Sequence, residues 1–120
     1  MFLALASFLG YFYMKVGISV VMIRGTTPTH TFNVPLLAEN IKKVKITYEQ
    51  DGVNILTKRE SDCTIANKKV TVRLTQEETL RFDHEKLVTI QIRVLSQNDD
   101  ALSSYPFSVN AIDCLDEEVL

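Results

Sequence analysis

The residues of this 120-residue chain that could do chemistry are few and widely spaced. The two cysteines, Cys63 and Cys114, each follow an aspartate, and the two histidines are His30 and His84. A structural zinc site needs about four such ligands at short spacings, so we predict no metal site. A disulfide would close a loop of roughly 50 residues, but the immunoglobulin-type bridge usually packs on a tryptophan, which this chain lacks. We favour free thiols over a bridge, with Cys63 packed in or near the core.

The other candidates for catalysis do not form a recognisable arrangement. Asp83, His84 and Glu85 are consecutive, so their side chains point in different directions and indicate a solvated turn. Ser103 and Ser104 lack the Gly-x-Ser-x-Gly frame of a nucleophile elbow, and the four glycines form no phosphate-binding loop. His30 falls on an apolar face, which favours a packed histidine. We therefore predict no catalytic residue, no cofactor and no enzyme activity.

Two polar segments are our candidate interaction surface. The first is a short basic strip, which we expect to protect the edge of a sheet because charged side chains discourage pairing with other strands. The second is a polar loop from Ser96 to Ala101. The predicted surface residues are Lys42, Lys43, Lys45, Asn98, Asp99 and Asp100.

The elements that must position these residues are strands, because apolar and polar residues alternate in short runs from Thr26 onward. The inward positions that this alternation predicts are His30, Phe32, Val34, Val44, Ile46, Tyr48, Val70, Val72, Leu74, Val88, Ile90, Ile92, Val94, Phe107, Val109 and Ala111. Asp51-Gly52 is a strong hairpin signal, and a second hairpin is centred on residues 66–68. The pattern predicts about seven strands in an all-β sandwich of immunoglobulin-like type.

One segment breaks the strand rhythm. Thr75 is followed three residues later by Glu78, which is the spacing of a capping box, so we expect a short helical turn near residues 75–80. Its role would be to carry the chain from one sheet to the other. The final segment, CLDEEVL, is acidic, and we expect it to fray.

The charge balance argues against a dedicated nucleic-acid binder. The chain has 13 Lys and Arg against 15 Asp and Glu, a net charge of −2, whereas such proteins normally show a basic excess concentrated in a patch. We expect no nucleic-acid partner.

The first 23 residues are a separate problem, because 18 of them are hydrophobic and Lys15 is the one charge among them. They are long enough for a membrane anchor, although Lys15 is costly there. A signal peptide would need a basic start and a small-residue cleavage site, and this segment shows neither. Two further interpretations are a strand-containing arm and an over-long start, because Met1, Met14 and Met22 could each begin translation. We favour Met22, and divide the chain into an apolar extension (1–21) and a β-sandwich domain (22–120).

Four stretches resemble a known class of proteins: MIRGTTPTHTFNV, VKITYEQDG, VTVRLTQEETLRF and IQIRVLSQNDDAL. Together they resemble small structural proteins encoded in the tail regions of phages and prophages of clostridia-like bacteria, and the opening resembles the N-terminal β-sandwich of phage baseplate upper proteins. The resemblance spans residues 22 to 118 and brings no catalytic motif, so no residue role is carried over.

This resemblance implies a non-enzymatic virion structural module of the tail or baseplate that acts through protein–protein contacts. Its partners would be other virion proteins, and self-association is expected because such assemblies are often symmetric. It would be found in the virion, or in the host cytoplasm during assembly. The alternative hypothesis, motivated by the apolar start, is a membrane-anchored or secreted bacterial β-domain that binds a surface ligand at the membrane or cell surface.

Overall fold

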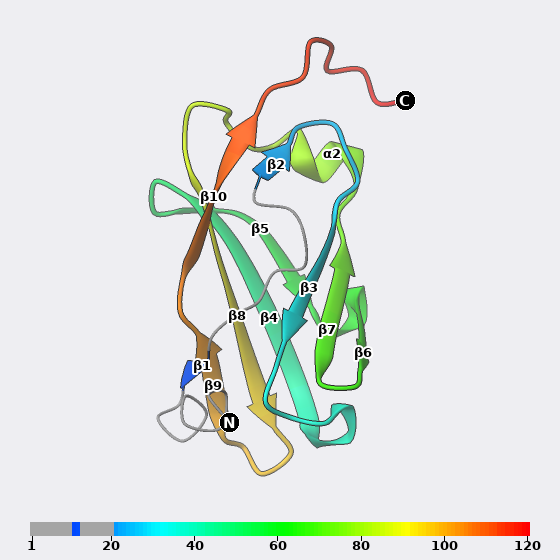
Figure 1. The fold of residues 1–120 in the computed structure, drawn as a ribbon, viewed down its shortest axis with the longest axis vertical. Coiled ribbons are helices and arrows are strands. Elements are labelled where there is room, and N and C mark those ends of the chain that lie inside the picture. The colour runs from blue at the N-terminus through cyan, green and yellow to red at the C-terminus, as the bar shows by residue number, and fades with distance from the viewer. Residues whose placement is uncertain (1–10, 13–20) are drawn as a thin grey trace.

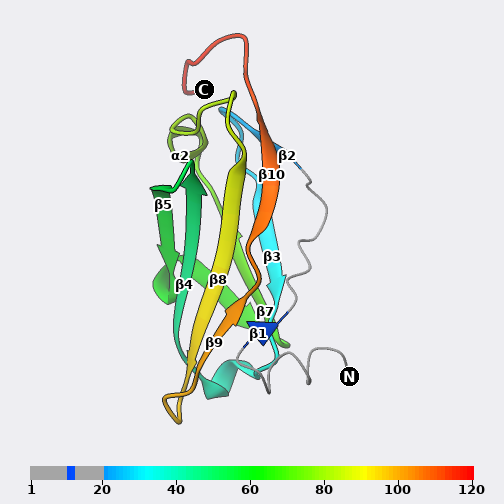
Figure 2. The same ribbon diagram turned by 90° about the vertical axis from the view of Figure 1, so that its left-hand side faces the viewer.

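The computed structural model describes residues 11–12 and 21–120, which form two β-sheets in two layers (Figures 1 and 2). The large sheet contains β1 (Tyr11–Phe12), β2 (Val21–Ile23), β4 (Ile41–Gln50), β5 (Val53–Arg59), β8 (Val88–Ser96), β9 (Ala101–Ser104) and β10 (Phe107–Ile112). The small sheet contains β3 (Thr29–Asn33), β6 (Cys63–Ala66) and β7 (Lys69–Arg73). Three short helical turns connect them: η1 (Ala38–Asn40), η2 (Glu60–Asp62) and α2 (Gln76–Thr79).

The large sheet is built around the antiparallel pair of its two longest strands, β4 and β8. On the far side of β4 lies β5, and the far side of β8 is shared by β9 and β10. Those two strands are separated by Tyr105 and Pro106, where proline cannot donate a ladder hydrogen bond. Beyond them, β1 runs parallel to β9 and β2 runs parallel to β10.

Two tight turns set the register of the hairpins. Asp51 and Gly52, which join β4 to β5, have φ of 54° and 77°, and Asn67 and Lys68, which join β6 to β7, have φ of 51° and 59°. Two consecutive residues with positive φ are the signature of the turn that matches the twist of paired strands. Both hairpins lie where the sequence predicts them.

The helical turn α2 carries the chain from the small sheet to the large one, as predicted. Thr75 Oγ1 accepts a hydrogen bond from Glu78 N at 3.1 Å, and Glu78 Oε1 accepts one from Thr75 N at 2.9 Å, which completes the capping box. Thr79, which is fully buried, accepts from Gly25 N at 3.0 Å and donates to Thr26 O at 2.9 Å. The turn therefore also fixes the segment that joins β2 to β3.

The core lies between the layers and is made by the inward positions of the strands. Nearly all the predicted inward residues are buried, including Phe32, Ile46 and Tyr48 at 0% exposure, and Phe107 is partly buried against them. Met22 and Phe82, which are not among the predicted inward positions, are also large, fully buried side chains of this core. The predicted fold class, an all-β sandwich with a short helical turn, is confirmed.

Three strands were not predicted, and one predicted loop is wrong in its bounds. The seven predicted strands are all present, and β1, β2 and β9 are additional. The loop expected from Ser96 to Ala101 is shorter, because Leu95 pairs with Ala101 and β9 begins there. In the described residues we find no helix long and apolar enough to span a bilayer. The hypotheses about residues 1–21 fall largely outside the described residues.

Candidate interaction surface

The structure brings the two predicted polar segments together at one end of the large sheet. Lys42 Nζ lies 2.7 Å from Asp99 Oδ1, so the start of β4 is bridged to the turn between β8 and β9. The hydrogen bond and charge of Lys42 hold the pKa of the Asp99 carboxyl below its usual value. Both side chains are largely exposed, and exposed pairs add little to stability.

The turn that carries Asn98, Asp99 and Asp100 is held by hydrogen bonds of Ser96 and Gln97. Ser96 is the anchor: its N donates to Asp100 O at 2.8 Å, and its Oγ accepts from Asp100 N at 3.0 Å. Gln97 N donates to Asn40 O at 2.9 Å, which ties the turn to η1. Asp99 has φ of 65°, a left-handed conformation that Asp tolerates better than most residues.

The prediction that the lysine strip protects a sheet edge is wrong for Lys45. The strand β4 is not an edge strand, because it pairs with β5 on one side and with β8 on the other. Lys45 lies directly between Arg59 of β5 and Arg93 of β8. Strand pairing depends on contacts far apart in the sequence, so the lysine alternation alone could not identify β4 as a central strand.

Four cations gather on the outer face of the large sheet, where β5, β4 and β8 lie side by side (Figure 2). A groove of 190 Å³ runs there. Its basic side chains are Lys43, Lys45, Arg59 and Arg93, and its apolar lining includes Leu95 and Ala101. We call this the cationic groove.

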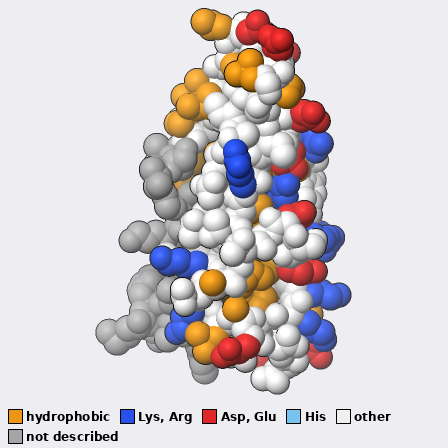
Figure 3. Space-filling model, turned by 90° about the vertical axis from the view of Figure 1, so that its right-hand side faces the viewer, with side chains coloured by type: hydrophobic (Ala, Val, Ile, Leu, Met, Phe, Trp, Pro, Cys, Tyr) orange, Lys and Arg blue, Asp and Glu red, His pale blue; other side chains and the backbone are white. Residues whose placement is uncertain are grey.

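The cationic groove is electrostatically unbalanced. Like charges directly opposite each other across strands are destabilising, and the row from Arg59 through Lys45 to Arg93 places three side by side. Among residues 21–120, none of the four basic side chains makes an ion pair. On the opposite side of the molecule (Figure 3), acidic and basic side chains are instead interspersed along one margin.

Two acids lie near the cationic groove: Glu49, which lines a neighbouring hollow of the same face with Lys45 and Arg93, and Glu60, which is already engaged. Glu60 Oε1 accepts a hydrogen bond from Val44 N at 2.8 Å. That bond, with the charges of Arg59 and Lys43, lowers the pKa of the Glu60 carboxyl. The carboxylate thus completes the backbone hydrogen bonding of β4 beyond the end of β5, and its single charge leaves the groove positive.

Sequence reasoning missed two members of the cationic groove, Arg59 and Arg93. Each occupies an outward position of its strand, so the alternation could place them on the outer face. Nothing local shows that they meet Lys45, because the two residues are 14 and 48 positions away from it. The register between strands is the missing information.

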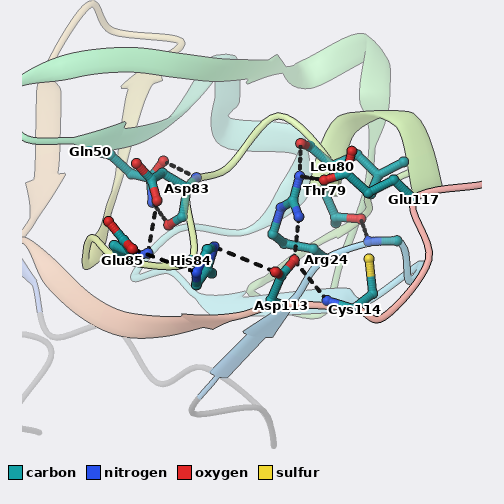
Figure 4. A network of polar contacts seen from close by, with 11 residues as sticks. Arg24, Gln50, Thr79, Leu80, Asp83, His84, Glu85, Asp113, Cys114 and Glu117 are labelled. Carbon is teal, nitrogen blue, oxygen red and sulfur yellow. Dashed lines mark hydrogen bonds and ion pairs between the residues drawn. The ribbon is translucent and has the colours of Figure 1, made fainter.

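A second polar cluster lies at the other end of the sandwich and is centred on Arg24 (Figure 4). The Arg24 guanidinium pairs with Asp113, donates to Leu80 O at 3.0 Å and lies 2.9 Å from Glu117 Oε1. We call this cluster the Arg24 clamp. It ties β2 to the turn after α2 and to the acidic tail, which we define as residues 113–120.

The acidic tail is held rather than frayed. Besides the contacts with Arg24, Leu120 N donates to Gln76 Oε1 at 2.7 Å, and Gln76 Nε2 donates to Leu120 O at 3.3 Å. The tail has no regular secondary structure, but these bonds return it to α2. The prediction of a frayed tail is therefore wrong.

The segment Asp83–Glu85 is a turn, as predicted, and the structure places it beside the Arg24 clamp. His84 is 46% exposed, and its Nδ1 lies 3.6 Å from Asp113 Oδ2. The turn is anchored by Gln50, whose Oε1 accepts from Asp83 N at 2.8 Å and whose Nε2 donates to Asp83 O at 2.7 Å. These contacts explain the buried glutamine at the end of β4.

The buried histidine joins the two sheets. His30 of β3 lies 3% exposed, and its Nδ1 is 2.7 Å from Tyr48 Oη of β4. Burial lowers the pKa of His30 to about 4 and raises the pKa of Tyr48 above its usual value. Both groups are therefore neutral at physiological pH, and their hydrogen bond acts as a polar link across the core.

Both cysteines are free and half-buried. Cys63 packs against the core and donates to Arg59 O at 3.2 Å, which agrees with the position predicted for it. Burial, followed by the charge of Asp62, raises the pKa of the Cys63 thiol to about 11. A thiol with this pKa is almost entirely protonated at neutral pH and is a poor nucleophile.

Ser103 and Ser104 form hydrogen bonds to the neighbouring strand β8. Ser104 is fully buried, and its Oγ accepts from Ile92 N at 3.1 Å, while Ser103 Oγ accepts from Gln91 Nε2 at 2.9 Å. Within residues 11–12 and 21–120, His, Cys, Asp and Glu side chains form no group of three or more that could hold a metal ion.

A further hollow of 440 Å³ lies between α2 and the acidic tail. Its lining includes Arg73, Glu77 and Val119, and Arg73 Nη2 donates to Thr27 Oγ1 at 3.3 Å. Gln76 in this hollow is already bonded to Leu120 of the tail, whereas the basic side chains of the cationic groove make no ion pair within residues 21–120. The cationic groove is therefore the stronger candidate for an external partner.

No model of a known protein family matches this chain, and no curated protein matches its sequence significantly.

Proposed function

We propose that this protein is a non-enzymatic structural module of a phage or prophage tail or baseplate, which acts through protein–protein contacts. The proposal joins the resemblance of its sequence stretches to such proteins with the surface that the fold presents. It places the protein in the assembled virion, or in the host cytoplasm during assembly.

The observation that supports contact with proteins is the cationic groove. Lys45, Arg59 and Arg93 repel one another across neighbouring strands, and a partner with complementary charge would relieve that repulsion. The inward side chains of β4 and β8 are buried in the core, which fixes the backbone beneath this surface. A charged face on such a sheet suits contact with a partner of complementary charge.

The free edge of β5 is a weaker candidate for the contact. Within the described residues, β5 pairs with β4 alone. However, Lys58 points inward from this strand and lies 2.6 Å from Glu78 Oε2. An inward-pointing charge is a device that discourages further strands from adding to an edge. The outer face is therefore the surface that we assign to partners.

The test is the composition of virion particles. We expect mass spectrometry of tail or tail-like particles, purified from an induced culture of the bacterium that encodes the chain, to detect this protein in a fixed ratio to the other tail proteins. A parallel membrane fraction from the same cells is the control. Recovery of the protein in the membrane fraction alone would contradict the proposal and favour the surface-ligand hypothesis.

A further inference from the structure

We infer that the cationic groove binds the acidic tail of a second copy of this chain, so that copies join head to tail. The inference rests on the proposed function, because it names one of the partners through which such a module would assemble. It is carried by the complementary charge and polarity of the two surfaces.

The cationic groove offers four positive charges around an apolar lining. Arg59 and Arg93 flank Lys45 across the strands, and Leu95 and Ala101 contribute apolar surface beside them. Arg59 and Arg93 are exposed, whereas Lys45 is half-buried between them. A segment that combines carboxylates with an apolar side chain would match this lining.

The acidic tail has that composition. Leu115 is fully exposed, and Asp116 and Glu118 are exposed acids that make no ion pair within residues 21–120. Figure 3 shows hydrophobic and acidic side chains together at the end of the molecule where the tail lies. Asp113 and Glu117 are instead held by Arg24. Arg24 and Gln76 therefore hold the tail at several points along its length, while Asp116 and Glu118 remain exposed.

The two surfaces belong to different ends of an elongated molecule, whose extents are 46 × 23 × 23 Å. The tail lies against Arg24 and Gln76 at one end, and β4 begins beside η1 at the other (Figure 1). In the structure the tail thus contacts its own α2 and not its own groove. A contact between the tail of one copy and the groove of the next uses two different patches, which produces a ring or a filament.

The experiment reverses the charge of the groove in one variant of the full-length chain and the charge of the tail in another. One variant carries Lys45→Glu, Arg59→Glu and Arg93→Glu, which leaves Lys43 as the one cation of the groove lining, so its groove and its tail are both acidic. The other carries Asp116→Lys and Glu118→Lys, so the outward side chains of its tail are basic, like its groove. Lys68→Glu with Lys69→Glu, where the β6–β7 turn enters β7, is the matched control for charge reversal away from the groove. Circular dichroism and the unfolding midpoint verify that each variant is folded.

Sedimentation over a series of protein concentrations measures the association. We expect the wild type and the matched control to associate, and each exchanged variant alone to associate at least about tenfold more weakly, because like charges then meet. An equimolar mixture of the two exchanged variants should associate again, since every groove then meets a tail of opposite charge. Added salt should weaken the wild-type association.

Three results would overturn the inference: a wild type that stays monomeric at every concentration, exchanged variants that associate as the wild type does, or a mixture that fails to recover. Each of these leaves the proposed function open to its own test, since a monomer can still be incorporated into particles through other proteins. Conversely, absence from particles combined with recovery in the mixture would separate self-association from a virion role.

Discussion

At the scale of single residues, one buried polar pair joins the two layers of this sandwich. His30 and Tyr48 come from different sheets and share one hydrogen bond in the core. A buried hydrogen bond of this kind adds only about 1 kcal/mol net, whereas leaving one partner unsatisfied costs more. The pair therefore constrains both positions more strongly than its contribution to stability suggests.

The burial of His30 makes the stability of the protein depend on pH. Its pKa is about 4 in the folded protein, against 6.5 for an unperturbed histidine. Between these values the unfolded chain binds a proton that the folded chain does not, so stability falls as the pH is lowered from 6.5 to 4 and this loss stops below 4. Burial of His30 accounts for a loss of roughly 3 kcal/mol over this window.

The measurement is the free energy of unfolding from urea titrations at several pH values, compared between the wild type and His30→Gln. Glutamine keeps a hydrogen-bonding group but does not titrate, so the wild-type curve should fall more steeply than the variant curve between pH 6.5 and 4. Parallel curves would show that His30 is not shielded from protons in the folded state.

At the scale of elements, Glu78 has two tasks that can be separated. It completes the capping box of α2, and its Oε2 lies 2.6 Å from Lys58 Nζ. Burial disfavours the Glu78 carboxylate, but the hydrogen bonds from Lys58 and Thr75 outweigh this and lower its pKa. The carboxylate therefore couples α2 to the inner face of β5.

We expect Glu78→Ala to lower the free energy of unfolding by about 2 kcal/mol, because it removes both the cap and the partner of Lys58. Glu78→Gln should cost less, since an amide oxygen can still accept from Thr75 N while the charge is lost. Urea unfolding of both variants tests this. Equal losses for Ala and Gln would show that the cap contributes nothing.

The two hairpin turns give a matched pair of opposite predictions. Gly52 has φ of 77°, and a Cβ added there would meet no atom within 4 Å, so Gly52→Ala should cost about 1 kcal/mol through backbone strain alone. Lys68 has φ of 59°, so Lys68→Gly should stabilise by about 0.5 kcal/mol. Thermal unfolding of the two variants measures both changes in stability, and we expect the midpoint to fall for Gly52→Ala and to rise for Lys68→Gly. A destabilised Lys68→Gly would mean that the lysine side chain makes a contribution larger than the strain.

The elements that could be predicted are those whose signal is local. The alternation in β4 and β8, the Asp51-Gly52 turn and the Thr75 capping box each lie within a few consecutive residues. The strand β9 was missed because ALSS contains a single large apolar residue after a polar turn. The strand β2 was missed because its three residues continue an apolar run and pair with β10, about 90 positions later.

The candidate surface shows the same division between local and distant information. The sequence identified Lys43 and Lys45 as outward cations, and it identified the turn that carries Asp99. It could not place Arg59 and Arg93 beside Lys45, and it wrongly assigned β4 to an edge, because both depend on which strands become neighbours. The surface as a whole is therefore a property of the sheet.

At the scale of the whole molecule, segments from near the two ends of the described chain pair with each other at one end of the sandwich. The strand β2 runs parallel to β10, with Met22 beside Ala111, and Arg24 N donates to Ile112 O at 2.9 Å. The Arg24 clamp then holds the acidic tail on the same end. These long-range contacts make the stability of the sandwich depend on where the folded chain begins.

Met22 is the residue on which this dependence can be tested, because its side chain is fully buried among the largest core residues. Removal of residues 1–20 takes away β1 but none of the described core, so we expect the free energy of unfolding to change by about 1 kcal/mol or less. Removal of residues 1–23 deletes Met22 and β2 and leaves the end of β10 unpaired. This second truncation should cost at least about 3 kcal/mol, as expected for losing a large buried side chain.

Met22→Leu in the full chain is the control, since a swap that conserves volume should cost less than about 1.5 kcal/mol. Equal stability of the two truncated chains in urea unfolding would show that β2 contributes nothing to the sandwich.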